Sequence, residues 1–157
     1  GNVNREGFTY WGNIDQPIDL TAEEDVAKYL VAAVAKPERA GDLRIVGDEH
    51  STREIVRIYN EVTGKNVEAR CLGSVEDLIQ TVNGMKNQGK LLEAVELGYA
   101  IPIFDGRGKI FDNDNDEFPE VDSLTFEAFL KKYHGKYQYP YSVNRSITRS
   151  LKDVEAF

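Results

Sequence analysis

Apolar residues recur at helical spacing in five stretches of the chain, and short alternating or β-branched runs separate them. Spacings of three and four residues place such side chains on one face of a helix. The pattern predicts helices that begin at Thr21, Ser51 and Ser74, a helical stretch over 91–95 and a short helix over 125–133. Pro102 lies in the apolar run 97–104, so a helix must end or bend there.

Local signals sharpen the boundaries of these elements. The pairs Thr21 with Glu24 and Ser51 with Glu54 have capping-box spacing, in which a hydroxyl and a carboxylate satisfy each other's backbone N–H groups. Gly64 suits the left-handed residue that follows a helix. Aromatic and β-branched content or alternation predicts short strands over 8–12, 16–20, 43–47 and 67–72.

The last residues form a second apolar pattern. Val143, Ile147, Leu151, Val154 and Phe157 are spaced by four, four, three and three residues, which makes one helical stripe. A terminal helix that packs on its own body fits this pattern. A helix that docks on a partner or exchanges with a second copy fits it as well. We therefore divide the chain into a main region, 1–141, and an amphipathic tail, 142–157.

Composition narrows the class of protein. A length of 157 residues suits one domain, and a net charge of −8 disfavours nucleic acid and anionic membrane surfaces as partners. No apolar run approaches the roughly 18 residues that span a bilayer. The single cysteine, Cys71, excludes an internal disulfide and favours a reducing, cytoplasmic location. Because Cys71 alternates onto the apolar face of its strand, we expect a buried thiol.

Three groups of residues, in a fixed order, carry a resemblance to a known family. The first joins a turn to a helix and comprises Gly12, 17–21, 23–26 and 32–34. The second joins a strand to a helix and comprises 43–46, 51–55 and Tyr59. The third precedes the final helix and comprises Gly106, Phe111, 118–121 and 125–130. Over residues 8–133 the chain resembles the carboxy-terminal, substrate-side half of NmrA-like and isoflavone-reductase-like proteins, which are atypical short-chain dehydrogenases.

The resemblance implies an α/β fold made of the last strands of a partial Rossmann-type sheet and a mostly helical substrate-binding subdomain. It implies that the complete protein binds NADP(H) through an amino-terminal half. The family's glycine-rich loop and its lysine belong to that half and have no counterpart here. The only similar string, Gly106-Arg107-Gly108, lacks the third glycine and the strand–helix setting that a phosphate site needs. We therefore assign no catalytic, cofactor-binding or metal-binding residue, and expect no cofactor on this chain alone.

Candidate substrate-pocket residues follow from the same resemblance, because the region 97–104 lies over the substrate in the family. Apolar and aromatic walls with a few polar groups are typical of small-molecule pockets, although each of these residues also fits core packing. The candidates are Tyr10, Trp11, Leu97, Tyr99, Ile101 and Phe104.

The acidic run 112–116 offers clustered oxygen ligands to a hard cation. An EF-hand loop from Asp112 would need glycine and glutamate where Glu117 and Ser123 stand. A solvated acidic loop is the better interpretation.

Three functions fit these observations: the substrate-binding portion of a reductase, inactive alone; a non-enzymatic, NmrA-type redox-sensing regulator; or a free-standing small-molecule or protein interaction module. An incomplete sheet has an open edge. The expected partners are therefore a small-molecule substrate in the complete protein, and the missing half or a second copy at the open edge and the 143–157 helix.

Overall fold

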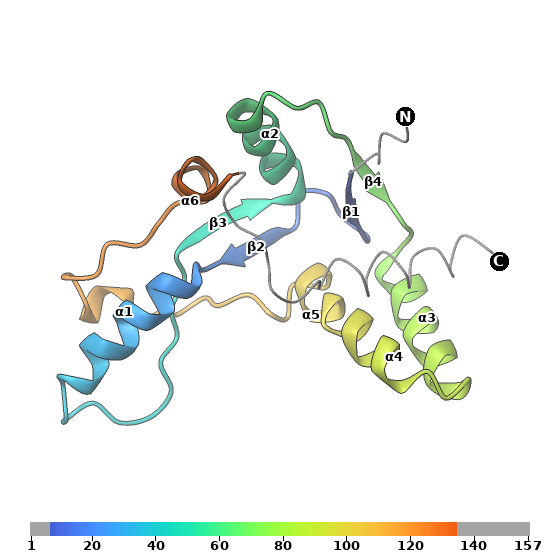
Figure 1. The fold of residues 1–157 in the computed structure, drawn as a ribbon. Helices are drawn as coiled ribbons and strands as arrows, with labels where there is room; N and C mark the ends of the chain where they lie inside the picture. The colour runs from blue at the N-terminus through green and yellow to red at the C-terminus, as the bar shows by residue number, and fades with distance from the viewer. Residues whose placement is uncertain (1–6, 135–157) are drawn as a thin grey trace.

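The computed structural model describes residues 7–134 and has a mixed α/β fold (Figure 1). Its strands are short, and most residues in regular secondary structure belong to helices. The elements in chain order are β1 (Phe8–Tyr10), β2 (Pro17–Leu20), α1 (Glu23–Val34), β3 (Asp48–Ser51), α2 (Thr52–Thr63), β4 (Ala69–Cys71), α3 (Val75–Asn87), α4 (Leu91–Gly98), α5 (Ala100–Phe104), the 3-10 turn η1 (Asn115–Glu117) and α6 (Phe126–Tyr133).

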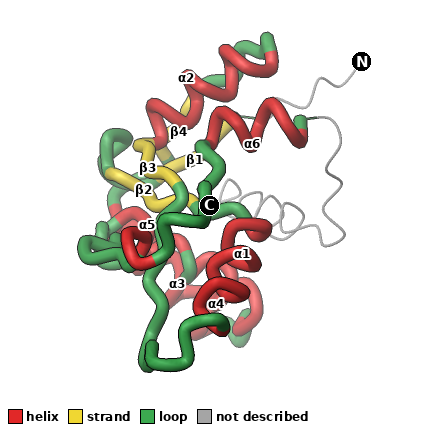
Figure 2. Tube along the Cα trace, turned by 90° about the vertical axis from the view of Figure 1, so that its left-hand side faces the viewer, coloured by secondary structure: helices red, strands yellow, loops and turns green. Residues whose placement is uncertain are grey.

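The strands of the described residues form two separate two-stranded sheets. In one, β1 runs parallel to β4, with Tyr10 opposite Cys71. In the other, β2 runs antiparallel to β3, with Leu20 opposite Asp48. The strands predicted near 8–12, 16–20 and 67–72 are confirmed with shorter bounds. Figure 2 shows these strands between α2 and α6 on one side and α1, α3 and α4 on the other.

The strand predicted over 43–47 is wrong. The segment is extended, but side chains of a later loop take the place of a neighbouring strand. Arg44 donates its backbone N–H to Asp114 Oδ2 at 2.8 Å, and Val46 donates to Asn115 Oδ1 at 3.2 Å. Asn115 Nδ2 donates back to the carbonyl of Val46 at 2.7 Å. Because these partners lie some 70 residues away in sequence, the local pattern could not distinguish this arrangement from a strand.

Two of the three predicted helix starts have the expected side-chain cap, and one does not. Ser51 caps α2 with Glu54, and Ser74 caps α3 with Asp77, each in a reciprocal capping box. The box predicted at Thr21 does not form, because α1 begins after Ala22 without a side-chain cap. The Thr21 hydroxyl accepts the Gly47 N–H at 3.2 Å instead. A long-range partner has therefore displaced the local one.

The main hydrophobic cluster lies between α3 and α4. It contains Trp11, Leu78, Val82, Met85, Ala94 and Leu97, with Leu72, Ala100, Ile101 and Phe104 packed against it. Figure 1 shows α3 and α4 as a helical pair with α5 continuing from α4. The helical break falls at Tyr99, and Pro102 lies inside the short α5 rather than at its end. We call α3, α4, α5 and Trp11 the apolar module.

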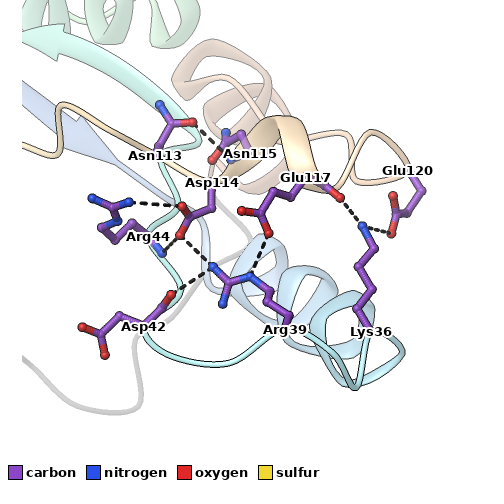
Figure 3. Close-up of polar contacts among 9 residues, drawn as sticks. All are labelled: Lys36, Arg39, Asp42, Arg44, Asn113, Asp114, Asn115, Glu117 and Glu120. Atoms are coloured by element: carbon purple, nitrogen blue, oxygen red, sulfur yellow. Dashed lines mark hydrogen bonds and ion pairs between the residues drawn. The ribbon is translucent and has the colours of Figure 1, made fainter.

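Charged and polar contacts organise the opposite side of the molecule. Asp25 is fully buried in α1, where its carboxylate accepts from Lys28 Nζ at 2.7 Å and from the Leu124 N–H at 2.8 Å. Figure 3 shows Arg39 between Asp114 and Glu117, at 2.8 and 3.0 Å. Lys36 reaches the carbonyl of Glu117 and, at 3.9 Å, the carboxylate of Glu120. We call α1 with segments 36–47 and 111–125 the ion-paired region.

No helix within residues 7–134 is long and apolar enough to cross a membrane. The amphipathic tail 142–157, including the predicted stripe from Val143 to Phe157, lies outside the described residues.

Candidate functional site at the carboxyl ends of β1 and β4

The six predicted pocket residues do not share one surface. Trp11, 3% exposed, and Leu97, 6% exposed, pack together in the apolar module, and Ile101 and Phe104 pack against the same cluster. Tyr99 is 71% exposed. Tyr10 is half-buried on β1. The structure thus brings four of the six together as core packing and leaves Tyr10 and Tyr99 outside that cluster.

Tyr10 and Cys71 end the two parallel strands and lie side by side. They are register partners, and the Tyr10 hydroxyl interacts with the Cys71 thiol. The expectation of a buried thiol is wrong, because Cys71 is exposed. Its strand pairs with β1 alone among the described residues, and the outer residues of such a narrow sheet remain open. Side chains at the carboxyl ends of parallel strands are the usual location of ligand sites in α/β folds.

An ion pair lies next to these two residues. Arg53, in the first turn of α2, grips Asp15 of the β1–β2 turn through Nε at 2.7 Å and Nη2 at 3.1 Å. The Arg53 backbone N–H also reaches the carbonyl of Ile14 at 3.4 Å. Two bonds from one guanidinium to one carboxylate fix their relative orientation. The N-terminus of α2 and the β1–β2 turn are therefore held together.

A hollow of about 330 Å³ opens beside this pair. Backbone from three elements surrounds it: the β1–β2 turn, the paired ends of β2 and β3, and the start of α2. Its lining residues are Asp15, Pro17, Glu49, Ser51, Arg53 and Glu54. Three of the six are carboxylates, so the hollow offers hydrogen-bond acceptors and one guanidinium donor.

The charges perturb one another in a consistent direction. Partial desolvation, followed by the neighbouring Cys71, raises the pKa of Tyr10, so the hydroxyl remains a proton donor at neutral pH. The hydrogen bond from Arg53 lowers the pKa of Asp15, and the same bond raises the pKa of Arg53. Near pH 7 the site therefore presents a neutral phenol beside a paired cation and anion.

The other sequence candidates have structural roles. In the string 106–108, Arg107 turns back on Asp105, with Nε 2.6 Å and the backbone N–H 2.9 Å from its carboxylate oxygens. The Arg107 and Gly108 N–H groups are thus bonded within the chain, the second to the carbonyl of Pro102. In the acidic run, Asp114 is ion-paired with Arg39 and Arg44 (Figure 3). Among residues 7–134, no group of three or more His, Cys, Asp or Glu side chains is placed to hold a metal ion.

Sequence reasoning found Tyr10 but missed Arg53 and Asp15. Arg53 stood in the capping motif of α2, where its own side chain carries no local signal. Asp15 occurs in a turn before β2, where aspartate is common for turn chemistry alone. Only the fold brings these residues to the end of β1.

Comparison with known proteins provides no relative for this site. No protein-family model matches the chain, and neither a curated protein nor a solved structure is significantly similar to it.

Proposed function

We propose that the chain is the substrate-side portion of an NADP(H)-dependent, reductase-like protein of the NmrA-like and isoflavone-reductase-like family. In this proposal β1 and β4 continue the Rossmann-type sheet of a nucleotide-binding half. The observation that carries it is the parallel pairing of β1 with β4, with Tyr10 and Cys71 at the carboxyl ends. Parallel sheets are normally wider and covered on both faces, so a two-stranded one suits a sheet that extends further.

An exposed apolar face on α1 supports the same proposal. Val26, Leu30, Val31 and Val34 are all exposed along one side of this helix. A hollow of about 610 Å³ adjoins them, lined in part by Ala27, Ala35 and Val121. Apolar surface of this kind on a soluble domain marks an interaction site. The nucleotide-binding half would cover it.

The roles of this chain's residues follow from the site geometry. NADP(H), held by the other half, would supply the hydride. Tyr10, kept protonated, would donate a hydrogen bond to a carbonyl or phenol of a small aromatic substrate. The pair Arg53–Asp15 would fix the wall of the hollow beside it. This chain alone would bind no dinucleotide and catalyse no reduction.

Two titrations test the proposal. Calorimetry with NADPH should give no saturable heat up to millimolar cofactor. Saturable micromolar binding would contradict the proposal that the other half alone holds the nucleotide. Saturation-transfer NMR with 4-hydroxyacetophenone, an aromatic ketone, should show contact with the wild-type chain. Tyr10→Phe should weaken that contact several-fold, whereas the matched variant Tyr99→Phe should leave it unchanged.

The alternative is an NmrA-type redox-sensing regulator or an interaction module. The exposed apolar face of α1 and the exposed residues Leu91, Leu92 and Val95 of α4 support it. In that case the aromatic ketone should not bind, or should bind equally well to the wild-type chain and Tyr10→Phe.

A further inference from the structure

A second exposed apolar face runs along α4 and α5. Leu91, Leu92, Val95, Tyr99 and Ile103 are between 41% and 79% exposed, and Pro102 between them is exposed as well. Tyr99 joins the two helices with helical backbone angles, φ −62° and ψ −22°, so the side chains follow one another along a nearly continuous path. On the opposite side, Ala94 and Leu97 are buried in the apolar module. The α4–α5 face is therefore a stripe about 18 Å long at 1.5 Å per residue.

The order of residues in this stripe reads almost the same from both ends. Residues 91 and 103, 92 and 102, and 95 and 99 are equally distant from position 97. A two-fold dimer requires one surface to complement itself, with residue i against residue j and j against i. When two such helices run antiparallel about an axis at position 97, Leu91 meets Ile103 of the other copy. Leu92 then meets Pro102, and Val95 meets Tyr99.

One charge beside the stripe opposes this arrangement and another favours it. The stripe itself carries no charged residue, but Glu96 beside it lies one position from the axis, so the Glu96 carboxylates of the two copies would approach each other. Lys90, at the start of α4, would lie near the last turn of the opposite α5, where cations are favoured by the helix dipole. A parallel arrangement would in addition bring Lys90 close to Lys90.

The area is sufficient for a modest dimer. From their exposed fractions, the five large side chains present roughly 500 Å² per copy. Full burial of both copies gives about 1,000 Å², which is the size of a weak or transient interface. The face of α1 is also apolar, but it is shorter. Its exposed residues Val26, Leu30, Val31 and Val34 lie within 26–34 of one helix, whereas the α4–α5 stripe extends over 91–103.

We propose that the α4–α5 face is a homodimer interface, at which two copies of this chain pack antiparallel about a two-fold axis at the level of Leu97. The inference does not depend on the reductase proposal, since it concerns only this chain. Because each copy carries a net charge of −8, the dimer should tighten as salt screens the repulsion between copies.

Sedimentation equilibrium of the full chain tests this inference. The wild type should be a monomer–dimer mixture with a dissociation constant on the order of 10 µM, tighter at 500 mM than at 50 mM NaCl. Val95→Glu and Leu92→Glu should each weaken the dimer at least tenfold. Val34→Glu, at an exposed apolar position on α1, is the matched control and should leave the dimer intact.

The register has its own test, in a Cys71→Ser background that removes the native exposed thiol. A Val95→Cys chain mixed with a Tyr99→Cys chain should form a crossed disulfide more readily than either chain alone. A wild type that is monomeric at 100 µM, or equal weakening by Val34→Glu and Val95→Glu, would overturn the proposal. Dimerisation that is lost in Val95→Glu but shows no preferred crossed disulfide would exclude the antiparallel register. NADPH and aromatic-ketone binding are measured separately, so failure of the dimer leaves the reductase proposal standing.

Discussion

The apolar module and the ion-paired region use different interactions to solve the same problem of joining distant segments. In the module, Trp11 from the amino-terminal end packs among α3 and α4 residues that come some 65 to 85 positions later. In the ion-paired region, α1 and segment 36–47 meet segment 111–125 through Asp25, Arg39 and Asp114. Apolar burial is non-directional and strongly stabilising, whereas most exposed ion pairs contribute little net stability but fix geometry.

The comparison indicates that one region determines the stability of the fold and the other determines the conformation of its loops. We expect the module to dominate the free energy of unfolding. We expect the ion-paired region to hold its long loops in one arrangement and to be sensitive to pH. Tyr29 and Phe118, edge to face at 5.8 Å with both rings buried, are the apolar exception in that region.

The largest expected effect is in the module. Leu78 is fully buried at the centre of the cluster, so Leu78→Ala should lower the free energy of unfolding by about 2–5 kcal/mol. Urea denaturation followed by circular dichroism measures it. Val34→Ala, at a position 82% exposed, is the control and should change stability by less than about 0.5 kcal/mol. Equal losses in the two variants would contradict the assignment of the core.

The buried carboxylate of α1 gives the next effect. Asp25→Ala removes the acceptor of the Leu124 N–H and should cost about 1–3 kcal/mol in the same denaturation experiment, because a buried donor is left without a partner. Lys28→Ala should cost less, because that side chain is 44% exposed. If the lysine variant lost more, the ion pair rather than the backbone contact would be the stabilising interaction.

A pH dependence separates the two regions further. The backbone N–H of Arg44, together with Arg44 and Arg39, lowers the pKa of Asp114. A carboxylate with a lowered folded-state pKa stabilises the fold above its unfolded pKa, and this contribution is lost as the pH falls through the folded pKa.

Asp114→Asn should therefore destabilise the chain at pH 7, and the difference from wild type should shrink as the pH falls from about 5 towards 3. Thermal melts at several pH values provide the measurement. The difference between wild type and Leu78→Ala should stay nearly constant over the same range, which is the contrast that the two regions predict. A constant Asp114→Asn difference would show that its ion pairs do not matter for stability.

The smallest expected effect concerns Cys71. Its exposed thiol should react with one equivalent of a thiol reagent such as dithionitrobenzoate without denaturant. Cys71→Ser should change stability by less than about 0.5 kcal/mol. Slow labelling that needs denaturant would restore the buried position expected from the sequence.

Local signals predicted the helices well, because caps and apolar periodicity act within a few residues. Ser51, Ser74 and Gly64 all have the predicted roles, and Gly64 adopts φ 68°. Segment 43–47 and Thr21 were mispredicted because their backbone partners come from residues 114–115 and from Gly47. No short window of sequence contains that information.

The site was predicted less well for the same reason. Aromatic residues near a predicted strand pointed equally to packing and to binding, and the fold separates Tyr10 from Trp11, its immediate neighbour in sequence. Tyr10 belongs to the strand end beside Cys71 and Arg53, while Trp11 enters the module. The pairing of Arg53 with Asp15 spans 38 positions and has no periodic pattern that could reveal it.

The position of Trp11 also decides what spectroscopy can observe. It is the only tryptophan in the chain and lies in the α3–α4 cluster, 3% exposed. Its emission therefore monitors melting of that cluster and is nearly blind to the loops around Arg39. If the midpoint from circular dichroism comes before the midpoint from fluorescence, α1 and its ion pairs have loosened before Trp11 meets water. Trp11 emission compared with circular dichroism therefore shows whether the apolar module and the ion-paired region unfold together.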